Sequence, residues 1–414
     1  MKIWHFTKTI YGGSGQYTLR LSNALKALGH QSEVYVAEGG VPSGVQNLSC
    51  VSSSRQNFAN RCLVAALRRV SKGPYHSGFR LDSWNIQDDM DSNYPDIVHL
   101  HGMTGWIGFD GLRKLIPPNT LVFWTAHDLW MLSGGCVVYQ GCNLYQYSCC
   151  ACPILKGPVS IWSQQEWKHK AKFIQDYKVI PIANSRWVAK KISESSVFSH
   201  LHETEIPVVP PIVDSIFLKA TSLPSLRDEL KIPSHRVVLG LGARSLTDPY
   251  KGIPEFIQQL STDEELSHNC TIILCGDGHV QVPENLDCHF LGALTSSKAL
   301  AQFYSACDVF ISPSRMETFG MTLLESQAAE TPVAAFRVGG TPEAVAPQQF
   351  QYLAELGQDS NLVNKVKKLL SDKRKNTQIG VKSSEWIRDH FSDIMVAKRQ
   401  AYLYEKRTMN RNST

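Results

Sequence analysis

The feature that most constrains the fold is a short apolar run that leads through a polar loop into a helix, between residues 308 and 329. The run itself, 308–311, is rich in β-branched and aromatic residues, which is typical of a buried parallel strand. The residues beyond the loop include leucines and alanines at helical spacing, and both are good helix formers. A strand, a loop and a helix in this order predict a βα unit of an α/β fold.

The loop of this unit and the start of its helix predict an anion site. Gly320 stands where the backbone must pass close to another group, and the helix then begins with unsatisfied N–H groups at Met321 and Thr322. Glu317 precedes this cradle and Glu325 follows inside the helix. Two carboxylates around a positive cradle suit a ligand that carries both phosphates and sugar hydroxyls. The plainer alternative is an ordinary βα unit with two solvated glutamates.

A second strand, loop and helix open the chain. Residues 2–6 predict a strand, 11–15 form a glycine loop, and 16–28 predict a helix with one apolar face. This order is typical of the first unit of a doubly wound domain. Tight-turn glycines that bind nothing are at least as common as ligand loops.

Two further apolar strands lead to histidines. The strand 96–100 ends at His101, and the strand 121–125 leads to His127 and Asp128. Residues at the carboxyl end of a parallel strand point into the crevice where ligands bind. A histidine beside a carboxylate can bind a sugar hydroxyl or stabilise developing charge, so His127 is the stronger candidate. His101 is either an acceptor contact or a buried, hydrogen-bonded histidine, and Asp128 alternatively only orients the loop.

Five of the 11 cysteines lie between residues 136 and 152, inside a predicted insert at 133–160. Cys136, Cys142, Cys149 and Cys152 follow the pattern C-x5-C-x6-C-x2-C, which a closed, structural zinc site can use. Stable disulfides are not expected in a reducing cytoplasm. The alternative to zinc is a set of reduced cysteines that pack as small hydrophobic residues.

The length of 414 residues is too great for one ordinary core and predicts two domains. Consecutive prolines stiffen the segment 208–214, which we interpret as the crossing between them. The predicted divisions are an N-terminal domain at 1–208, a linker at 209–217, a C-terminal domain at 218–385 and a final helical segment at 386–414.

Two cations follow the first strand predicted for the second domain, 236–242. Arg244 lies at the carboxyl edge of that strand, and Lys251 precedes a helix that starts at 253. An arginine fork and a lysine near the ligand edge of a sheet suit a diphosphate, while solvated surface cations are the alternative. A later strand, 271–275, ends at Gly276 in a Gly-Asp-Gly turn.

Composition excludes several classes of protein. With 43% hydrophobic and 19% charged residues the chain is globular and not disordered. No apolar run approaches the ~20 residues that span a bilayer, and the N-terminus lacks the apolar core of a signal peptide, so we expect a cytoplasmic location. The net charge of +5 fits an anionic substrate or membrane surface but not a nucleic-acid partner. Residues 60–70 predict a helix with a modest apolar stripe and arginines on a solvated face, and a helix that lies on a membrane surface is the alternative.

Taken together, these motifs resemble those of retaining GT-B glycosyltransferases of family 4, group 1. Glu317 and Glu325 match the two glutamates of the E-x7-E signature, and Phe319-Gly320 matches its aromatic-glycine pair. The resemblance covers nearly the whole chain. It implies two doubly wound, Rossmann-like domains that face each other across a cleft, with the last helix packing back on the first domain. The cysteine insert is similar to that of a subset that builds bacterial surface polysaccharides.

The resemblance also implies roles for single residues. Glu325 would hold the ribose of a nucleotide, Glu317 the transferred sugar, and Arg244 with Lys251 the diphosphate. The residues implied as catalytic are His127, Glu317, Arg244 and Lys251. The residues implied for donor binding are Gly13, Arg244, Lys251, Gly276, Glu317, Phe319, Gly320, Met321, Thr322 and Glu325.

The implied reaction moves a sugar, with retention and without a metal, from a nucleotide-diphosphate sugar to a glycan or polyprenyl-linked glycan of a capsule, O-antigen or exopolysaccharide. No cofactor is expected besides the donor. A lipid-linked acceptor would bring the chain to the cytoplasmic face of the inner membrane. The alternatives are a GT-B nucleotide-sugar epimerase or phosphorylase, and a non-catalytic partner that binds a nucleotide sugar.

Overall fold

The computed structural model describes residues 1–38, 45–50, 54–71, 75–78, 84–86, 94–105, 108–138, 141–201, 205–357 and 359–412. The chain forms two compact units. The first consists of Met1–Pro210 together with the C-terminal residues from Val396, and the second of Pro211–Met395. The change from one unit to the other therefore falls within the proline-rich segment 208–214.

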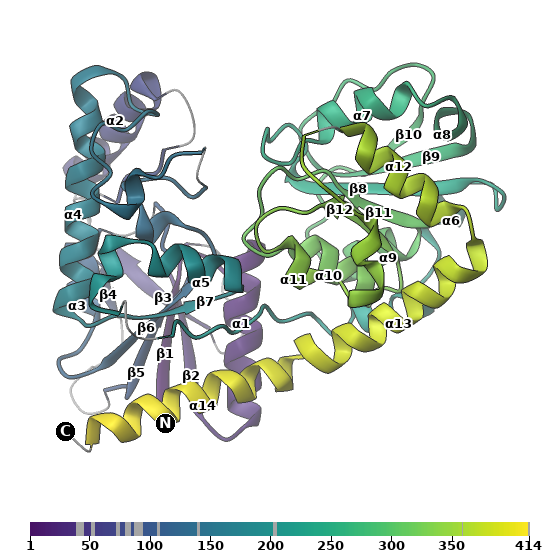
Figure 1. The fold of residues 1–414 in the computed structure, drawn as a ribbon. Coiled ribbons are helices and arrows are strands. Elements are labelled where there is room, and N and C mark those ends of the chain that lie inside the picture. The colour runs from purple at the N-terminus through teal and green to yellow at the C-terminus, as the bar shows by residue number, and fades with distance from the viewer. Residues whose placement is uncertain are drawn as a thin grey trace. The chain divides into compact units, whose positions relative to one another are not determined.

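The first unit is built on a sheet that has seven strands within the described residues, in the order β4-β3-β2-β1-β5-β6-β7 (Figure 1). Its neighbouring strands pair in parallel except for β3 and β4, which are antiparallel. The strands are β1 Lys2–Thr7, β2 Gln31–Val36, β3 Val45–Cys50, β4 Trp84–Ile86, β5 Ile97–Leu100, β6 Leu121–Ala126 and β7 Ile180–Ala183. The α-helices are α1 Gly12–Ala27, α2 Ser54–Val70, α3 Phe109–Leu115, α4 Ile161–Asp176, α5 Arg186–Ser193 and, from Val396 onward, α14 Asp393–Asn412.

The second unit is built on a sheet whose described strands are all parallel, in the order β10-β9-β8-β11-β12-β13. The strands are β8 Val237–Ser245, β9 Cys270–Asp277, β10 Asp287–Phe290, β11 Val309–Ser312, β12 Val333–Phe336 and β13 Leu353–Ala354. The α-helices are α6 Leu226–Glu229, α7 Ile253–Ser261, α8 Glu264–Asn269, α9 Ser297–Ser305, α10 Met321–Ala328, α11 Thr341–Ala344, α12 Asp359–Leu370 and α13 Lys373–Phe391.

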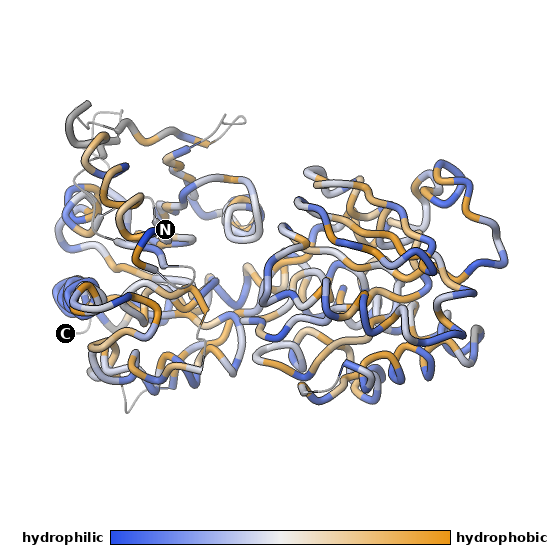
Figure 2. The backbone as a smooth tube through the Cα atoms, turned by 90° about the horizontal axis from the view of Figure 1, so that it is seen from above, coloured by the Kyte–Doolittle hydropathy of each residue, from blue (hydrophilic) through white to orange (hydrophobic). Residues whose placement is uncertain are grey.

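Each face of the second sheet carries its own hydrophobic core. Successive strand residues point to opposite faces, so Val238 packs in a cluster with Leu323 and Ile387, while Leu239 packs in another with Phe256. Strands β11 and β12 are buried throughout because helices cover both faces, which is the usual arrangement of a parallel sheet. The helices alternate between hydrophobic and hydrophilic segments in Figure 2, as expected of elements with one face on a core.

The first helix begins earlier than predicted. The sequence suggested residues 16–28, and α1 spans Gly12–Ala27. Glycine is a poor helix former, which is why the glycine run looked like a loop. A Cβ atom at Gly15 would lie 2.1 Å from the carbonyl oxygen of Thr9, so a glycine is required at this position within the helix. The glycine therefore lets the first turn of α1 pack directly on the backbone that precedes it.

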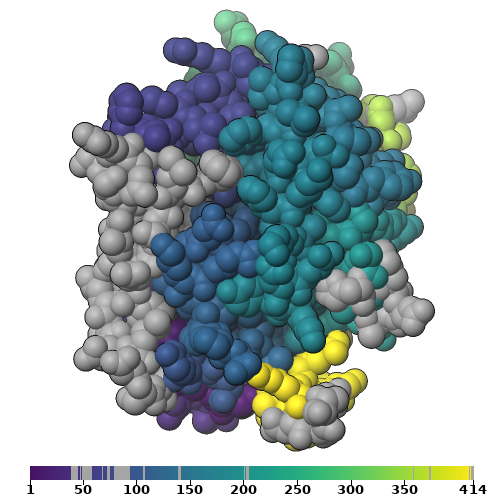
Figure 3. Space-filling model, turned by 90° about the vertical axis from the view of Figure 1, so that its left-hand side faces the viewer, coloured from purple at the N-terminus to yellow at the C-terminus, as the bar shows by residue number. Residues whose placement is uncertain are grey.

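The C-terminal helix belongs to the first unit from Val396 onward. Tyr404 is fully buried there, its hydroxyl is hydrogen-bonded to the ring of His99, and Thr408 lies against Met1. Figure 3 shows residues of this helix, in yellow, beside N-terminal residues in purple at the lower edge of the molecule. The two ends of the chain thus help to build the same unit.

The predicted helix at 60–70 lies within α2, where Leu67 is buried and Leu63 and Val70 are half-buried. Among the described residues, no helix combines the length and the apolar character that a membrane span requires.

Candidate active site

The predicted donor-site residues of the second unit sit on loops that follow its parallel strands. Arg244 lies near the end of β8, Lys251 in the turn that leads to α7, Gly276 near the end of β9, and Glu317 between β11 and α10. Because neighbouring strands are parallel, their carboxyl ends meet at one edge of the sheet. Ligands of doubly wound domains bind at this edge.

Lys251 and Glu317 form an ion pair, with Nζ of the lysine donating to Oε1 of the glutamate at 2.6 Å. Both side chains are largely buried, with exposed fractions of 31% and 15%. Burial by itself lowers the pKa of Lys251, but the nearby Glu317 carboxylate and, more weakly, Asp248 outweigh it, so the pKa of Lys251 is raised overall. The lysine therefore stays positively charged at neutral pH.

The loops that carry this pair are joined at a second point. The backbone N–H of Arg315 donates to the carbonyl oxygen of Tyr250 at 2.7 Å. Gly252 has a φ of +62°, and a Cβ atom there would lie 2.4 Å from the carbonyl oxygen of Pro313. Only glycine accepts both the backbone angle and the close approach. The position of Lys251 relative to Glu317 is thus fixed by backbone contacts.

A glycine pair from the next loop, after β12, supports Glu317 from another side. The N–H of Gly340 donates to the carbonyl oxygen of Glu317 at 3.0 Å. A Cβ atom at Gly339 would lie 1.9 Å from the same oxygen, and one at Gly340 would lie 2.2 Å from the carbonyl oxygen of Thr318. This supporting role could not be read from the sequence, because the contact joins loops that are distant along the chain.

The helix α10 starts directly after Gly320, whose φ of +116° is left-handed. Met321 and Thr322 are half-buried at its first two positions, where helix N–H groups have no partner within the helix. The ring of Phe319, in contrast, is 97% buried in the core and packs edge-on against Phe391. Any contact of Phe319 with a donor would therefore come from its backbone.

Glu325 is held by a buried tyrosine that the sequence did not single out. The hydroxyl of Tyr304, on α9, donates to Oε2 of Glu325 at 3.0 Å. Tyr304 is 1% exposed, and burial followed by the Glu325 charge raises its pKa well above the ordinary value. The hydroxyl therefore remains a proton donor, which fixes the direction of the Glu325 carboxylate.

Arg244 and Gly276 play different parts at the same edge. Arg244 is exposed, so its guanidinium is accessible to a ligand. Gly276 has a φ of +148°, and a Cβ atom there would lie 2.0 Å from the carbonyl oxygen of Ala243. Gly276 thus lets the ends of β8 and β9 approach each other. This packing alone explains why residue 276 is a glycine, and no ligand contact is needed to explain it.

In the first unit, His127 follows β6 and is hydrogen-bonded to a second histidine. Its Nε2 lies 3.2 Å from Nδ1 of His101, and Nε2 of His101 lies 3.0 Å from Nδ1 of His5. Burial lowers the pKa of His127 to about 4 and that of His5 to about 3, and it also lowers the pKa of His101. All three rings are therefore neutral at pH 7.

The two alternatives for neighbouring residues are decided by these contacts. His101 is fully buried and hydrogen-bonded on both ring nitrogens, so its side chain does not reach a ligand. Asp128 accepts hydrogen bonds from the Thr104 hydroxyl and the Trp130 N–H, both at 2.9 Å. It orients the loop after β6.

Gly13 lies in the first turn of α1 and is exposed. Among the described residues, none comes within 4 Å of a Cβ atom built on it, so packing does not require a glycine there. The structure thus groups the predicted residues into two sets. The set of the second unit is Arg244, Lys251, Gly276, Glu317, Phe319, Gly320, Met321, Thr322 and Glu325, and the set of the first unit is Gly13 and His127.

Two Rossmann-like units of this kind define the GT-B fold. Residues 11–215 match the family model described as Glycosyltransferase Family 4, and residues 243–386 match the model described as Glycosyl transferases group 1. The fold is therefore GT-B, and the two matches together cover most of the chain with glycosyltransferase family models.

Three known proteins illustrate the similarity. D-inositol 3-phosphate glycosyltransferase of Corynebacterium glutamicum is 30% identical over 45% of this chain and 47% of its own length. Capsular polysaccharide biosynthesis glycosyltransferase CapM of Staphylococcus aureus is 24% identical over 42% of this chain and 47% of its own length. The structure of Anabaena HepE in complex with UDP-glucose has a TM-score of 0.62 at 16% identity and covers 98% of this chain and 100% of that one. The chain spans about half the length of the curated relatives it matches.

Proposed function

We propose that the chain is a retaining, metal-independent glycosyltransferase that moves a sugar from a nucleotide-diphosphate sugar to a glycan or lipid-linked glycan. The observation that carries the proposal is the Lys251–Glu317 pair beside the first turn of α10, at the carboxyl edge of a parallel sheet. Positive charge, helix N–H groups and a carboxylate at one place match a diphosphate joined to a sugar. The similarity to HepE, solved with UDP-glucose, supports this class of donor.

The proposed donor contacts follow from hydrogen-bonding capacity. A lysine ammonium has three N–H groups, and the bond to Glu317 uses one of them, so two remain for phosphate oxygens. Oε1 of Glu317 accepts the hydrogen bond from the lysine, and the other carboxylate oxygen can accept one from a sugar hydroxyl. Glu325, whose direction is set by Tyr304, would accept bonds from the ribose hydroxyls.

In the proposed reaction the departing diphosphate is neutralised by Lys251 and by the exposed Arg244. Charge stabilisation of a leaving group by fixed cations is a large contribution to catalysis. Glu317 is already bound to Lys251, which suits a positioning role better than that of a nucleophile that forms a covalent sugar intermediate. We therefore propose that the acceptor attacks from the face that the diphosphate leaves, and that a phosphate oxygen takes the acceptor's proton.

The acceptor class is proposed from the relatives. CapM is named for capsular polysaccharide biosynthesis, and we propose a surface polysaccharide, free or polyprenyl-linked, as the product of this chain. His127, neutral because burial lowers its pKa to about 4, would meet the transferred sugar as a hydrogen-bonding group. Activity of the chain at the cytoplasmic face of a membrane is part of the same proposal.

The test combines donor binding with product analysis. The native chain and Glu325→Ala are heated with a panel of nucleotide-diphosphate sugars, where a ligand at ~100 times its dissociation constant adds about 2.7 kcal/mol to the stability of the native chain. A shift for one nucleotide that the variant loses supports the donor site. Nuclear magnetic resonance of the glycoside formed from that donor must then show the anomeric configuration of the donor. Inversion, or a product formed without any acceptor, contradicts the proposal.

A further inference from the structure

The cysteine insert is a segment with little regular structure of its own. Within the described parts of 133–160 the regular elements are two short 3-10 turns, Leu144–Gln146 and Gly157–Ser160. The buried residues of its small hydrophobic cluster are Cys152, Ile154 and Leu155. Small segments that lack a large core usually depend on a cross-link or a bound metal.

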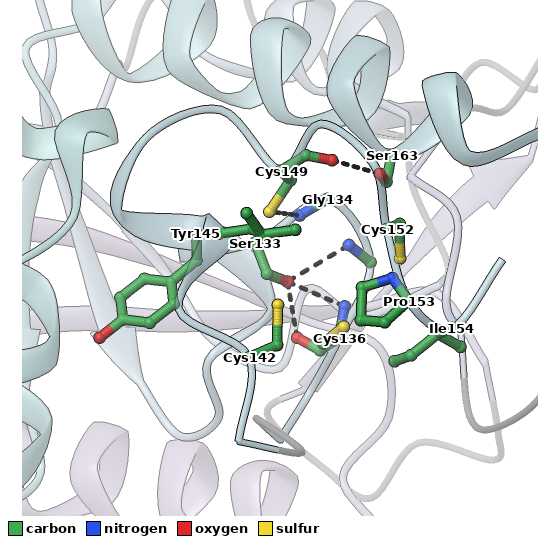
Figure 4. Close-up of a pocket in the computed structure, with 12 residues that line it drawn as sticks. Ser133, Gly134, Cys136, Cys142, Tyr145, Cys149, Cys152, Pro153, Ile154 and Ser163 are labelled. Atoms are coloured by element: carbon green, nitrogen blue, oxygen red, sulfur yellow. Dashed lines mark hydrogen bonds between the residues drawn. The ribbon is translucent and has the colours of Figure 1, made fainter.

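Four of the five cysteines in this segment line one cavity. Cys136, Cys142, Cys149 and Cys152 surround it, as Figure 4 shows, and they are the four of the C-x5-C-x6-C-x2-C pattern. The fifth, Cys150, is exposed and lies outside the lining. The fold therefore selects the four cysteines of the metal-binding pattern and turns the remaining one away. The ten cysteines whose side chains the structure describes are all free thiols.

The backbone around the cavity is arranged for sulfur ligands. The N–H of Gly134 donates to Sγ of Cys149 at 3.1 Å. The hydroxyl of Ser133 accepts from the N–H of Cys136 at 2.8 Å, which fixes the turn that presents that cysteine. Cys149 and Ala151 have φ values of +49° and +54°. Residues other than glycine adopt this region rarely and hold it where the surroundings demand it.

A buried cation lies close to the thiols. Lys170, on α4, is fully buried, and its ammonium donates to the carbonyl oxygens of Trp130 and Ser133 at 2.8 Å each. Its charge interacts with Cys149 and Cys136 as well as with two acidic side chains. Zinc held by four thiolates carries a net charge of two minus, and a buried ammonium beside it lowers the cost of that charge.

We propose that Cys136, Cys142, Cys149 and Cys152 bind one structural zinc ion as a closed, four-thiolate site. On binding, the four thiols release four protons, and four zinc–sulfur bonds replace the four S–H bonds without a change of oxidation state. Four cysteine thiolates in a tetrahedral arrangement are typical of a zinc site or an iron–sulfur cluster. The cavity of about 20 Å³ has room for about one water-sized particle, which suits a single ion better than a larger cluster.

Binding must draw the sulfur atoms together. The group of described side chains whose ligand atoms all lie within 4.8 Å of one another is His5, His99 and His101, so no three of the four sulfurs are that close. In that histidine group every ring nitrogen except Nε2 of His5 is already hydrogen-bonded, to another histidine, to Thr125 or to Tyr404. The cysteine loop thus closes around its ion, and zinc should stabilise the first unit.

The experiment measures zinc in the full chain, purified under reducing conditions without chelator. We expect inductively coupled plasma mass spectrometry to find about one zinc ion per chain. Cys149→Ser and Cys142→Ser should lose most of the zinc, while the matched control Cys150→Ser should keep it. Where a variant does not fold, the native chain gives a second readout: chelation should lower its melting temperature, and added zinc should restore it.

Each other outcome overturns the proposal. If the native protein contains no zinc and the four proposed ligands react as free thiols, they are packing cysteines. Disulfide-linked peptides would show that the cysteines form cross-links. Iron together with visible charge-transfer bands would show an iron–sulfur cluster. Equal loss of zinc from Cys150→Ser and Cys149→Ser excludes the assigned ligand set. The readouts are metal content and melting temperature, so they are independent of any transferase activity.

Discussion

Nζ of Lys251 donates to Oε1 of Glu317 at 2.6 Å, and this pair joins two loops of the second unit. Backbone hydrogen bonds, and not this side-chain pair alone, hold the two loops in position. The loop of Lys251 is held by the Tyr250–Arg315 backbone bond, and the loop of Glu317 by the N–H of Gly340. A preorganised cation with spare N–H groups is what a departing diphosphate requires.

Lys251→Ala should therefore lower kcat by about 100-fold or more, since removal of one charge-stabilising group typically costs that much. The melting temperature should change far less, because Glu317 keeps its backbone support. Steady-state kinetics with the donor found by the binding panel gives the measurement. Lys367→Ala is the matched control, because Lys367 is 35% exposed and paired with Asp263 and Glu265 on the helices of the same unit. Similar rates for both variants contradict the assigned role.

Gly339→Ala should disturb the same site from behind. A methyl group there would lie 1.9 Å from the carbonyl oxygen of Glu317, so the loop must move. We expect activity to fall sharply and stability to drop by about 1–3 kcal/mol, the usual cost of overpacking. Gly357→Ala also changes a glycine with a positive φ, +135° compared with +53° at Gly339, but a Cβ atom there meets no described atom within 4 Å, so this variant tests backbone strain without the clash. Thermal unfolding and donor turnover should separate the two variants, and equal effects would assign the loss to strain.

Tyr304→Phe removes the hydroxyl that donates to Glu325 and leaves the ring in place. The free energy of unfolding should fall by about 0.5–1.5 kcal/mol, the net value of a typical hydrogen bond. The KM for the donor should rise with little change in kcat, because Glu325 contacts the ribose and not the reacting bond in the proposed complex. Tyr352→Phe is the control, a buried tyrosine of the other hydrophobic cluster. An unchanged KM in Tyr304→Phe would remove Tyr304 from the donor site.

Elements with strong local patterns were predictable from the sequence. The run 308–311 and strand β11 Val309–Ser312 differ by one residue, because a short β-branched run has few other ways to be buried. The support of Glu317 by Gly339 was not predictable, since it joins loops that only the sheet order brings together. The Tyr304–Glu325 bond was not predictable either, because it joins two helices, α9 and α10, that pack together only in the folded unit. The start of α1 was wrong because glycine, a poor helix former, is required within the helix at Gly15.

Stability of the first unit should depend on pH through its buried histidines. Burial lowers the pKa of His127 to about 4 and of His5 to about 3, from an ordinary value of 6.5. Between these values and 6.5 the unfolded chain binds more protons than the folded one, so stability is complete above pH 6.5 and is lost as the pH falls. The slope is at most ~1.4 kcal/mol per pH unit for each such histidine. Denaturant unfolding at pH 7 and 5 measures it, and His127→Asn should lower the slope. A pH-independent stability would contradict the burial of neutral rings.

The hydrogen bonds that join His5, His101 and His127 predict one tautomer for His127. Nε2 of His5 is buried and has no partner among the described groups. An unpaired buried N–H is rarer than an unpaired acceptor, so Nε2 of His5 carries no proton and its Nδ1–H donates to Nε2 of His101. Nδ1–H of His101 then donates to Nε2 of His127, which places the proton of His127 on Nδ1.

This tautomer makes His127 a hydrogen-bond donor, and not an acceptor, through Nδ1. Correlation of ring protons with ring nitrogens in the 15N-labelled chain at pH 7 reports the proton position directly. The exposed His390 is the reference, because its Nδ1 bonds the Trp386 carbonyl within its own helix and it takes no part in the network of buried histidines. His101→Asn should release the preference of His127 while leaving His390 unchanged. Protonation of His127 on Nε2 in the native protein would reverse the direction of the hydrogen bonds that join His5, His101 and His127 and would contradict this prediction.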